Sequence, residues 1–207
     1  MMPDGTFLKE PIIGEYVRDD AQWYIDQTYR EATLEQSRTT VRVDIAGSPI
    51  YQPYYIDKRT DFEELRLDMI EEVRNRMNDD DLWIPKDVWS LYYAENHHAD
   101  AHVHPNTCLS VIWYPLAEDG CGTLEFFDPD MTVEPKDNML VIFDGYHRHG
   151  VFPNVQKGAR RVCLVFNVFS LSYLKLHPPE NKRGWYDVDV KYGGPYDEIW
   201  EQILNDN

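Results

Sequence analysis

The chain carries one stretch that decides its fold class, Arg161-Val162-Cys163-Leu164-Val165-Phe166-Asn167-Val168. Side chains on a β-strand point alternately to its two faces, so this stretch has one wholly apolar face and one mixed face. The apolar face must pack against other elements of the protein. If helices cover it, the mixed face, which includes Arg161, turns toward the interior of a barrel.

Four further apolar runs precede this stretch, and residues typical of turns separate them. The predicted strands are Val88–Ala94, Leu109–Leu116, Thr123–Phe127, Met139–Phe143 and Arg161–Phe169. Short strands at regular intervals are typical of a sandwich, a barrel or a jelly roll. We therefore predict a mainly β fold, with helices packed on one side.

The expected helices lie in the first half of the chain. One is predicted over Asp19–Gln36. The second begins at Thr60-Asp61-Phe62-Glu63, which has the form of a capping box. It continues as a stripe of apolar residues three or four positions apart, Phe62, Leu65, Met69, Val73 and Met77. A stripe with this period is typical of a helix that packs on a core.

The length of 207 residues indicates one domain. Within it we expect a mostly helical arm over 1–84, a barrel core over 85–176 and an extension over 177–207. The extension should contain a short helix over 195–204. The aromatic stretch Tyr51–Tyr55 is expected either to cover the barrel mouth as a lid or to pack between arm and barrel.

The composition excludes several classes of protein. Hydrophobic residues make up 43% of the chain, which is enough for a core, and the net charge of −17 disfavours binding to nucleic acids and to anionic substrates. No apolar run approaches the length of a membrane span. Three scattered cysteines, Cys108, Cys121 and Cys163, suit a reducing compartment, so we expect a cytoplasmic protein.

The distribution of the histidines is the strongest indication of a functional site. Six of the seven histidines fall in two windows: His97, His98, His102 and His104, then His147 and His149. On an extended chain His102 and His104 point to the same face and can converge on one ion. A hairpin could bring His149 alongside as a third ligand. Three ligands on one side of an octahedral ion leave positions open for substrate and oxygen.

Arg161 is the second indication of a functional site. A guanidinium that turns into a barrel keeps its charge and needs an anionic partner. That partner is either an Asp or Glu of the protein or a bound dicarboxylate. Arg160, on the other face, is expected to be exposed to solvent.

In this order, the motifs resemble those of the Fe(II)/2-oxoglutarate-dependent oxygenases, in the prolyl-hydroxylase-like branch of the double-stranded β-helix (cupin-like) fold. The matching segments are Tyr93-Ala94-Glu95-Asn96, His102-Val103-His104-Pro105-Asn106, Leu109–Tyr114, Gly122–Phe126, His149–Pro153 and Arg161–Asn167. The chain is similar in particular to small bacterial oxygenases that carry an H-x-H-P motif.

The resemblance implies that His102, His104 and His149 hold Fe(II). It implies that Arg161 binds the distal carboxylate of the cosubstrate 2-oxoglutarate and that Tyr114 donates a hydrogen bond to it. Tyr93 would reach the keto-acid end, and Cys163 and Asn167, on the same face as Arg161, are further candidates for binding the cosubstrate. The implied activity is hydroxylation of an amino acid, a peptide or another small molecule, with release of succinate and CO2. A homodimer is a further possibility.

Two positions depart from the family pattern. His104 stands where the family has a carboxylate, which leaves the iron site with a charge of +2 instead of +1. A His98/Asp100/His149 set would restore the usual charge and is the rival ligand set. Cys163 stands where the family often has Ser or Thr, and a thiol is a weaker hydrogen-bond donor.

Two other functions remain open at this point. His104 in the carboxylate position favours a three-histidine, cupin-type dioxygenase that needs no 2-oxoglutarate, whereas an inward Arg161 disfavours it. The second is a metal-binding domain without turnover, in which coordination is complete.

Overall fold

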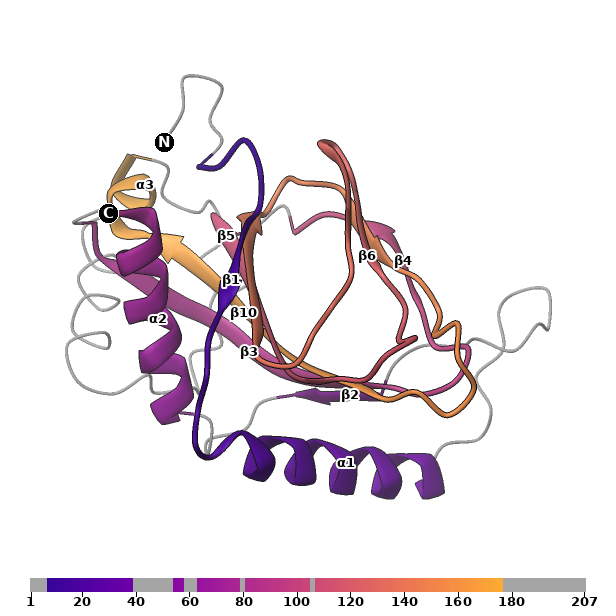
Figure 1. Ribbon diagram of the computed structural model, residues 1–207. Helices are drawn as coiled ribbons and strands as arrows, with labels where there is room; N and C mark the ends of the chain where they lie inside the picture. The colour runs from indigo at the N-terminus through magenta and orange to yellow at the C-terminus, as the bar shows by residue number, and fades with distance from the viewer. Residues whose placement is uncertain (1–6, 39–53, 58–62, 79–80, 105–106, 177–207) are drawn as a thin grey trace.

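In the computed structural model of the chain, which describes residues 7–38, 54–57, 63–78, 81–104 and 107–176, two antiparallel sheets face each other (Figure 1). The large sheet has the strand order β1-β8-β5-β10-β3-β2, and the small sheet has the order β4-β9-β6-β7. The large sheet comprises β1 (Ile12–Glu15), β2 (Tyr54–Asp57), β3 (Trp83–Tyr93), β5 (Leu109–Ala117), β8 (Met139–Asp144) and β10 (Arg161–Ser170). The small sheet comprises β4 (Ala99–His102), β6 (Leu124–Phe127), β7 (Asp130–Val133) and β9 (His149–Val151).

The predicted β fold is confirmed. The five predicted strands form β3, β5, β6, β8 and β10. Four of them lie within one residue of the expected bounds, whereas β3 begins at Trp83, well before the expected start at Val88 and within the arm expected to be mostly helical. β10 lies between β3 and β5 and is buried along its whole length, as its apolar sequence requires.

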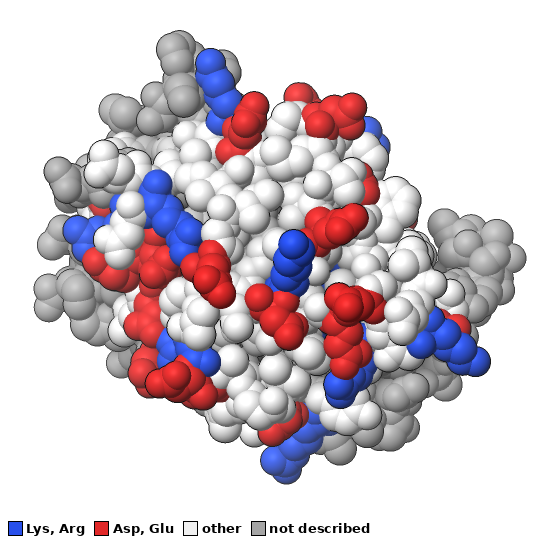
Figure 2. All heavy atoms as spheres, in the orientation of Figure 1, with Lys and Arg blue, Asp and Glu red and all other residues white. Residues whose placement is uncertain are grey.

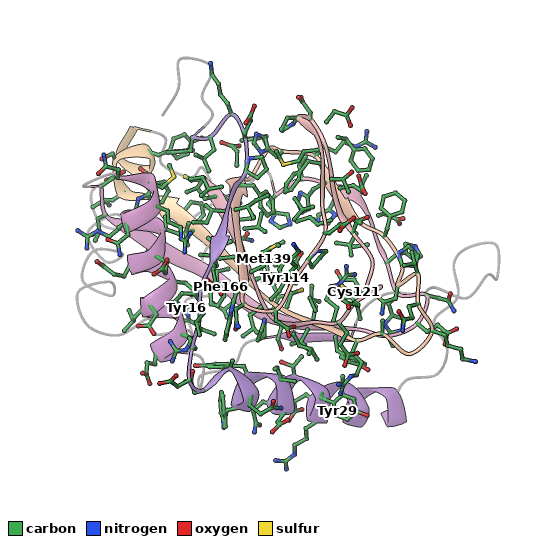
Figure 3. The ribbon with its side chains drawn as sticks, in the orientation of Figure 1. Tyr16, Tyr29, Tyr114, Cys121, Met139 and Phe166 are labelled. Carbon is green, nitrogen blue, oxygen red and sulfur yellow. The ribbon has the colours of Figure 1, made fainter. Side chains whose placement is uncertain are left out.

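The two faces of β10 pack as the alternation predicts. Val162, Leu164, Phe166 and Val168 belong to a core on the helix-facing side of the large sheet. Cys163 and Val165 belong to a second core between the two sheets, together with Tyr114 of β5. Figure 3 labels one residue of each core: Phe166 belongs to the core on the helix-facing side, and Tyr114 belongs to the core between the sheets. The face that carries Arg161 therefore lines the barrel interior.

Helices cover the outer side of the large sheet (Figure 1). They are α1 (Ala21–Arg38) and α2 (Glu63–Met77), and a third short helix, α3 (Leu171–Leu176), follows β10. The predicted stripe of α2 packs into the outer core, since Leu65, Met69 and Val73 have no exposed surface. The proposed capping box before Glu63 and the helix predicted over 195–204 lie outside the described residues.

The arm before residue 85 also supplies strands that periodicity does not predict. β1 pairs with β8, and β2 pairs with β3, so each extends an edge of the large sheet. Each has only four residues, which is too short to show a period of two. Of the aromatic stretch that begins at Tyr51, Tyr54 and Tyr55 form the start of β2, and residues 51–53 lie outside the described part.

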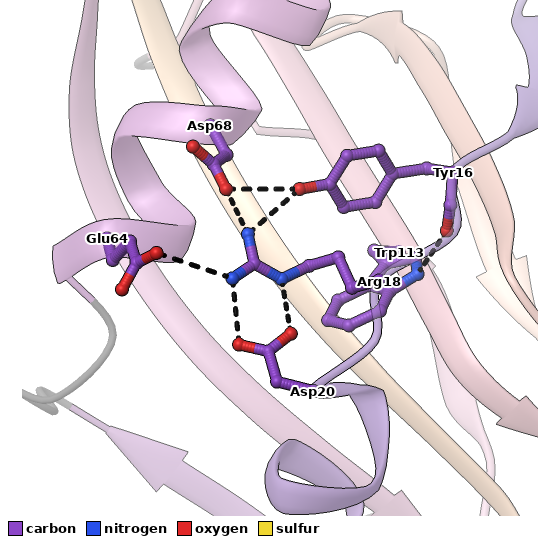
Figure 4. Close-up of polar contacts among 6 residues, drawn as sticks. All are labelled: Tyr16, Arg18, Asp20, Glu64, Asp68 and Trp113. Atoms are coloured by element: carbon purple, nitrogen blue, oxygen red, sulfur yellow. Dashed lines mark hydrogen bonds and ion pairs between the residues drawn. The ribbon is translucent and has the colours of Figure 1, made fainter.

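A polar network ties the segment after β1 to α2 and β5 (Figure 4). The Arg18 guanidinium donates to Asp20 at 2.7 Å and contacts Asp68 of α2, and its side chain is only 10% exposed. Next to it, the indole of Trp113 donates to the carbonyl of Tyr16 at 3.1 Å. These contacts hold the arm against the back of the barrel.

The surface matches the strongly negative composition. Figure 2 shows acidic side chains spread over one face of the molecule, with Lys and Arg between them. Within the described residues, no helix combines the length and the apolar character that a bilayer crossing would need.

Candidate metal centre

Three histidines converge at one end of the barrel. His102 ends β4, His104 follows it, and His149 begins β9. β4 and β9 are antiparallel neighbours in which His102 and His149 are register partners. The ring centroids lie 4.4 to 5.1 Å apart, and one nitrogen of each ring lies within 4.8 Å of the others. A single metal ion could therefore contact all three rings.

The hydrogen bonds of the rings settle which nitrogen each one offers. The Nδ1 atom of His102 lies 2.6 Å from the carbonyl oxygen of Asp100, and that of His149 lies 2.8 Å from the carbonyl oxygen of His147. A carbonyl only accepts, so both Nδ1 atoms carry a proton and both Nε2 atoms keep a free lone pair. Such a partner is the usual second contact of a metal-bound histidine. The donor set therefore fits a divalent metal.

Burial rises across the triad from His102, which is exposed, through His104 to His149, which is only 3% exposed. Burial lowers the pKa of His149 to about 3, with a smaller contribution from the neighbouring rings. His149 is thus a neutral imidazole at physiological pH, the form that binds metals. The exposed His102 places the triad at an open end of the barrel, where a substrate can approach.

Gly145 allows the chain around His104 to pack closely. The amide of His104 donates to the carbonyl of Gly145 at 2.7 Å. A Cβ atom at position 145 would lie 2.5 Å from the carbonyl oxygen of Thr107 and 2.8 Å from that of His104. Only glycine leaves room for this contact, so Gly145 helps to place His104.

Arg161 lies deep in the interior with 1% of its surface exposed. Its guanidinium stacks over the ring of Tyr93, 4.0 Å from the centroid, and donates to the carbonyl oxygens of Gly122 and Phe152. Its Nε atom has no hydrogen-bond partner, and no Asp or Glu of the described residues forms an ion pair with it. A buried cation with only carbonyl partners favours an anionic ligand.

Asn154 braces the backbone around this guanidinium. Its side-chain Oδ1 atom accepts from the amide of Gly122 at 3.1 Å, and its Nδ2 atom donates to the carbonyl of Ala159 at 2.7 Å. A Cβ atom at Gly122 would overlap the carbonyl of Phe152, so the two segments touch directly. Asn154 therefore helps to fix the two carbonyl groups that hold Arg161.

Two other expected site residues line the same interior. Burial raises the pKa of the Tyr114 hydroxyl well above its usual value, so this group stays protonated, and within the described part of the chain it makes no hydrogen bond. It is an available donor. Burial also raises the pKa of Cys163 to about 12, which keeps the thiol neutral. Figure 3 labels Tyr114 and Cys121 in this region.

Asn167 lies further along β10 than Arg161, and its Oδ1 atom is 3.0 Å from Nδ1 of His104. Ser110 completes this contact from β5. The sequence analysis did not identify Ser110 as a site residue. The only indication in the sequence was that Ser110 is a polar residue within the apolar run that begins at Leu109.

The other histidines of the described residues lie outside the triad. The Nε2 atom of His98 is 3.7 Å from Asp100, and both side chains are exposed. Among the described residues, the only cluster of three candidate metal ligands is His102, His104 and His149. His97 accepts a hydrogen bond from the amide of Ala94, and His147 packs against Phe126.

No protein family model and no curated protein sequence matches the chain. Solved structures match its fold. A viral collagen prolyl hydroxylase from Paramecium bursaria Chlorella virus-1, in complex with 2-oxoglutarate, is 14% identical, with a TM-score of 0.56 over 77% of this chain and 93% of that one. A prolyl hydroxylase from Trichoplax adhaerens, bound to a peptide of hypoxia inducible factor, is 13% identical, with a TM-score of 0.55 over 83% and 88%.

HygX from Streptomyces hygroscopicus, with nickel and 2-oxoglutarate bound, is 10% identical, with a TM-score of 0.52 over 80% and 83% of the two chains. At these identities the likeness concerns the fold. The chain has the double-stranded β-helix fold of the Fe(II)/2-oxoglutarate oxygenases, which confirms the resemblance inferred from its motifs at that level.

Proposed function

We propose that the protein is an Fe(II)- and 2-oxoglutarate-dependent dioxygenase, with His102, His104 and His149 as the iron ligands. The main support is the unpaired, buried guanidinium of Arg161 in the barrel that carries the triad at its mouth. A metal ion and a deeper cation together suit a ligand that chelates at one end and bears a carboxylate at the other. 2-Oxoglutarate is such a ligand.

Each residue has a defined part in this proposal. Arg161 binds the distal carboxylate, and the Tyr93 ring supports the guanidinium from one face, a part that replaces the contact with the keto-acid end implied by the resemblance. Tyr114 donates a hydrogen bond to the same carboxylate, and Cys163 lines the interior as a neutral thiol. The apolar walls exclude water from the reacting groups. Iron, when bound, supplies the activation of oxygen and the oxidation of a C–H bond.

The charges of the site are consistent with an anionic cosubstrate. Three neutral imidazoles leave a divalent ion uncompensated, and Arg161 adds another positive charge. A dianion reduces the total from +3 to +1, whereas a neutral ligand leaves it unchanged. In an interior of low polarity such compensation is worth more than it is in water.

The position of the triad supports the proposed substrate class. Because His102 is exposed, the metal would lie where an amino-acid side chain, a peptide or another small molecule can reach it. A peptide is compatible with the fold, since the Trichoplax adhaerens prolyl hydroxylase is bound to one.

His104 favours a second candidate, a three-histidine dioxygenase that acts without 2-oxoglutarate. Oxygen uptake by the iron-loaded protein separates the two functions, because only the first depends on added 2-oxoglutarate. We prefer the 2-oxoglutarate-dependent function because Arg161 has no carboxylate partner among the described residues.

The direct test is an anaerobic titration of the Fe(II)-loaded protein with 2-oxoglutarate. Bidentate chelation of Fe(II) by a 2-oxo acid gives a weak visible absorption band, and we expect it to appear and saturate at one equivalent. Succinate in place of 2-oxoglutarate is the control, since it lacks the keto group. A spectrum that does not respond to 2-oxoglutarate would contradict the proposed cosubstrate.

A further inference from the structure

His104 differs from the other two members of the triad in what holds its ring. Backbone carbonyls hold the Nδ1 atoms of His102 and His149. The Nδ1 atom of His104 instead lies 2.5 Å from Oγ of Ser110 and 3.0 Å from Oδ1 of Asn167. The orientation of this ring therefore depends on side chains that a substitution can remove.

Ser110 and Asn167 form a rigid pair. They are register partners on the adjacent strands β5 and β10, and the Ser110 hydroxyl donates to Oδ1 of Asn167 at 2.7 Å. Ser110 has no exposed surface, and Asn167 is 7% exposed. Both strands lie inside the large sheet, which fixes the backbone of the two residues, and burial restricts the rotamers of their side chains.

The donors and acceptors in this contact assign the tautomer of His104. The single proton of the Ser110 hydroxyl is used by Asn167, so the serine oxygen faces His104 with lone pairs only. His104 then donates from Nδ1, and in the neutral ring its Nε2 atom keeps a lone pair for a metal. This is the state that a metal ligand requires.

We infer that Ser110 and Asn167 are positioning residues that fix His104 as the third metal ligand. The inference rests on the proposed metal centre and deepens it. It also says what orients a histidine at the position where the oxygenases that the chain resembles have a carboxylate. The pair is neutral, so it orients the imidazole without returning the negative charge that the carboxylate would have supplied.

The test measures the affinity of the metal-free protein for Co(II), together with the visible d–d spectrum of the complex. Ser110→Ala and Asn167→Leu are expected to weaken binding about 10-fold to 100-fold, the usual effect of losing such a contact. Both should also change the d–d bands, because the His104 ring turns relative to the ion. Thermal unfolding of the metal-free variants shows whether each still folds.

Asn167→Asp distinguishes positioning from mere packing. A carboxylate at position 167 accepts the same proton from His104 and brings a negative charge toward the ion, so Co(II) should bind more tightly than to the unsubstituted protein. A purely structural role predicts weaker binding for Asn167→Asp and Asn167→Leu alike. That result would overturn the inference.

Ser90→Ala is the matched control. Ser90 is also a fully buried serine of the large sheet, on β3, and its hydroxyl has no partner. It lies opposite Leu164 on the helix-facing side, so its loss should leave both Co(II) affinity and spectrum unchanged. If Ser110→Ala behaves like this control, the inference is wrong. If the unsubstituted protein binds no Co(II), the metal centre itself is wrong and the inference falls with it.

Discussion

Replacing Arg161 with methionine should separate cosubstrate binding from both folding and metal binding. Methionine keeps much of the apolar stem over the Tyr93 ring but removes the charge and the donors. The distal carboxylate of 2-oxoglutarate would lose charge-assisted hydrogen bonds, which contribute about 1.5–3 kcal/mol each. Taking about 3 kcal/mol in total, the dissociation constant for 2-oxoglutarate rises roughly 100-fold.

The same substitution should not destabilise the protein without ligand. Breaking a buried ion pair leaves an uncompensated charge, but here the guanidinium has no carboxylate partner among the described residues to leave behind. Removing this charge relieves the cost of burying it, which offsets the hydrogen bonds that the carbonyl oxygens of Gly122 and Phe152 lose. We therefore expect the melting temperature of metal-free Arg161→Met to lie close to that of the unsubstituted protein, with iron content unchanged.

Three measurements check this prediction: anaerobic titration with 2-oxoglutarate, colorimetric iron determination and thermal unfolding. Arg160→Met is the control, because the Arg160 side chain is half-exposed and pairs with Glu118 at 2.5 Å on the opposite face of the strand. An unchanged affinity for 2-oxoglutarate in Arg161→Met would refute the role of this residue. A large fall in melting temperature would show that Arg161 is a structural element instead.

The other predictions concern the triad, the loop beside it, the core and the thiols. His102→Ala should abolish binding of one equivalent of Fe(II), measured by equilibrium dialysis, whereas His98→Ala should not; the opposite pattern would favour the rival set with Asp100. Gly145→Ala should lower both the melting temperature and the metal affinity, because its Cβ overlaps the carbonyls of Thr107 and His104; a variant with normal metal binding would contradict the role given to this glycine. Leu164→Ala should reduce the free energy of unfolding in urea by about 2–5 kcal/mol, since Leu164 has no exposed surface in the outer core, and a loss below 1 kcal/mol would contradict that packing. Burial raises the pKa of Cys108 and Cys163 to about 12, so at pH 8 an alkylating reagent should label the half-buried Cys121 first, as peptide mass spectrometry would show; rapid labelling of Cys163 would mean that the barrel opens.

The sequence predicts those parts of the fold whose strands are long enough to show a period. The alternation of β10 predicts both which face meets the helices and which face carries Arg161 inward. β4 and β9, which present two of the three histidines, have four and three residues. No periodicity can be recognised in segments of that length, so these strands were found only through the histidines that they carry.

The contacts that orient the site were less accessible to sequence reasoning. Ser110 and Asn167 are far apart in the chain and meet only because β5 and β10 are neighbours in a particular register. The closeness of Gly145 to the chain around His104 likewise depends on how two loops cross. Such contacts are set by tertiary structure, and single residues give no sign of them beyond a polar or small side chain in an apolar setting.

The triad spans the seam between the two sheets, and this has a consequence for assembly. His102 and His149 come from the small sheet, while His104 is anchored by two strands of the large one. In the proposed metal centre, tight binding of the ion then requires that both halves of the barrel have closed in the right register. Iron would thus bind tightly only to correctly folded molecules, because a chain with a slipped strand offers the ion two imidazoles instead of three.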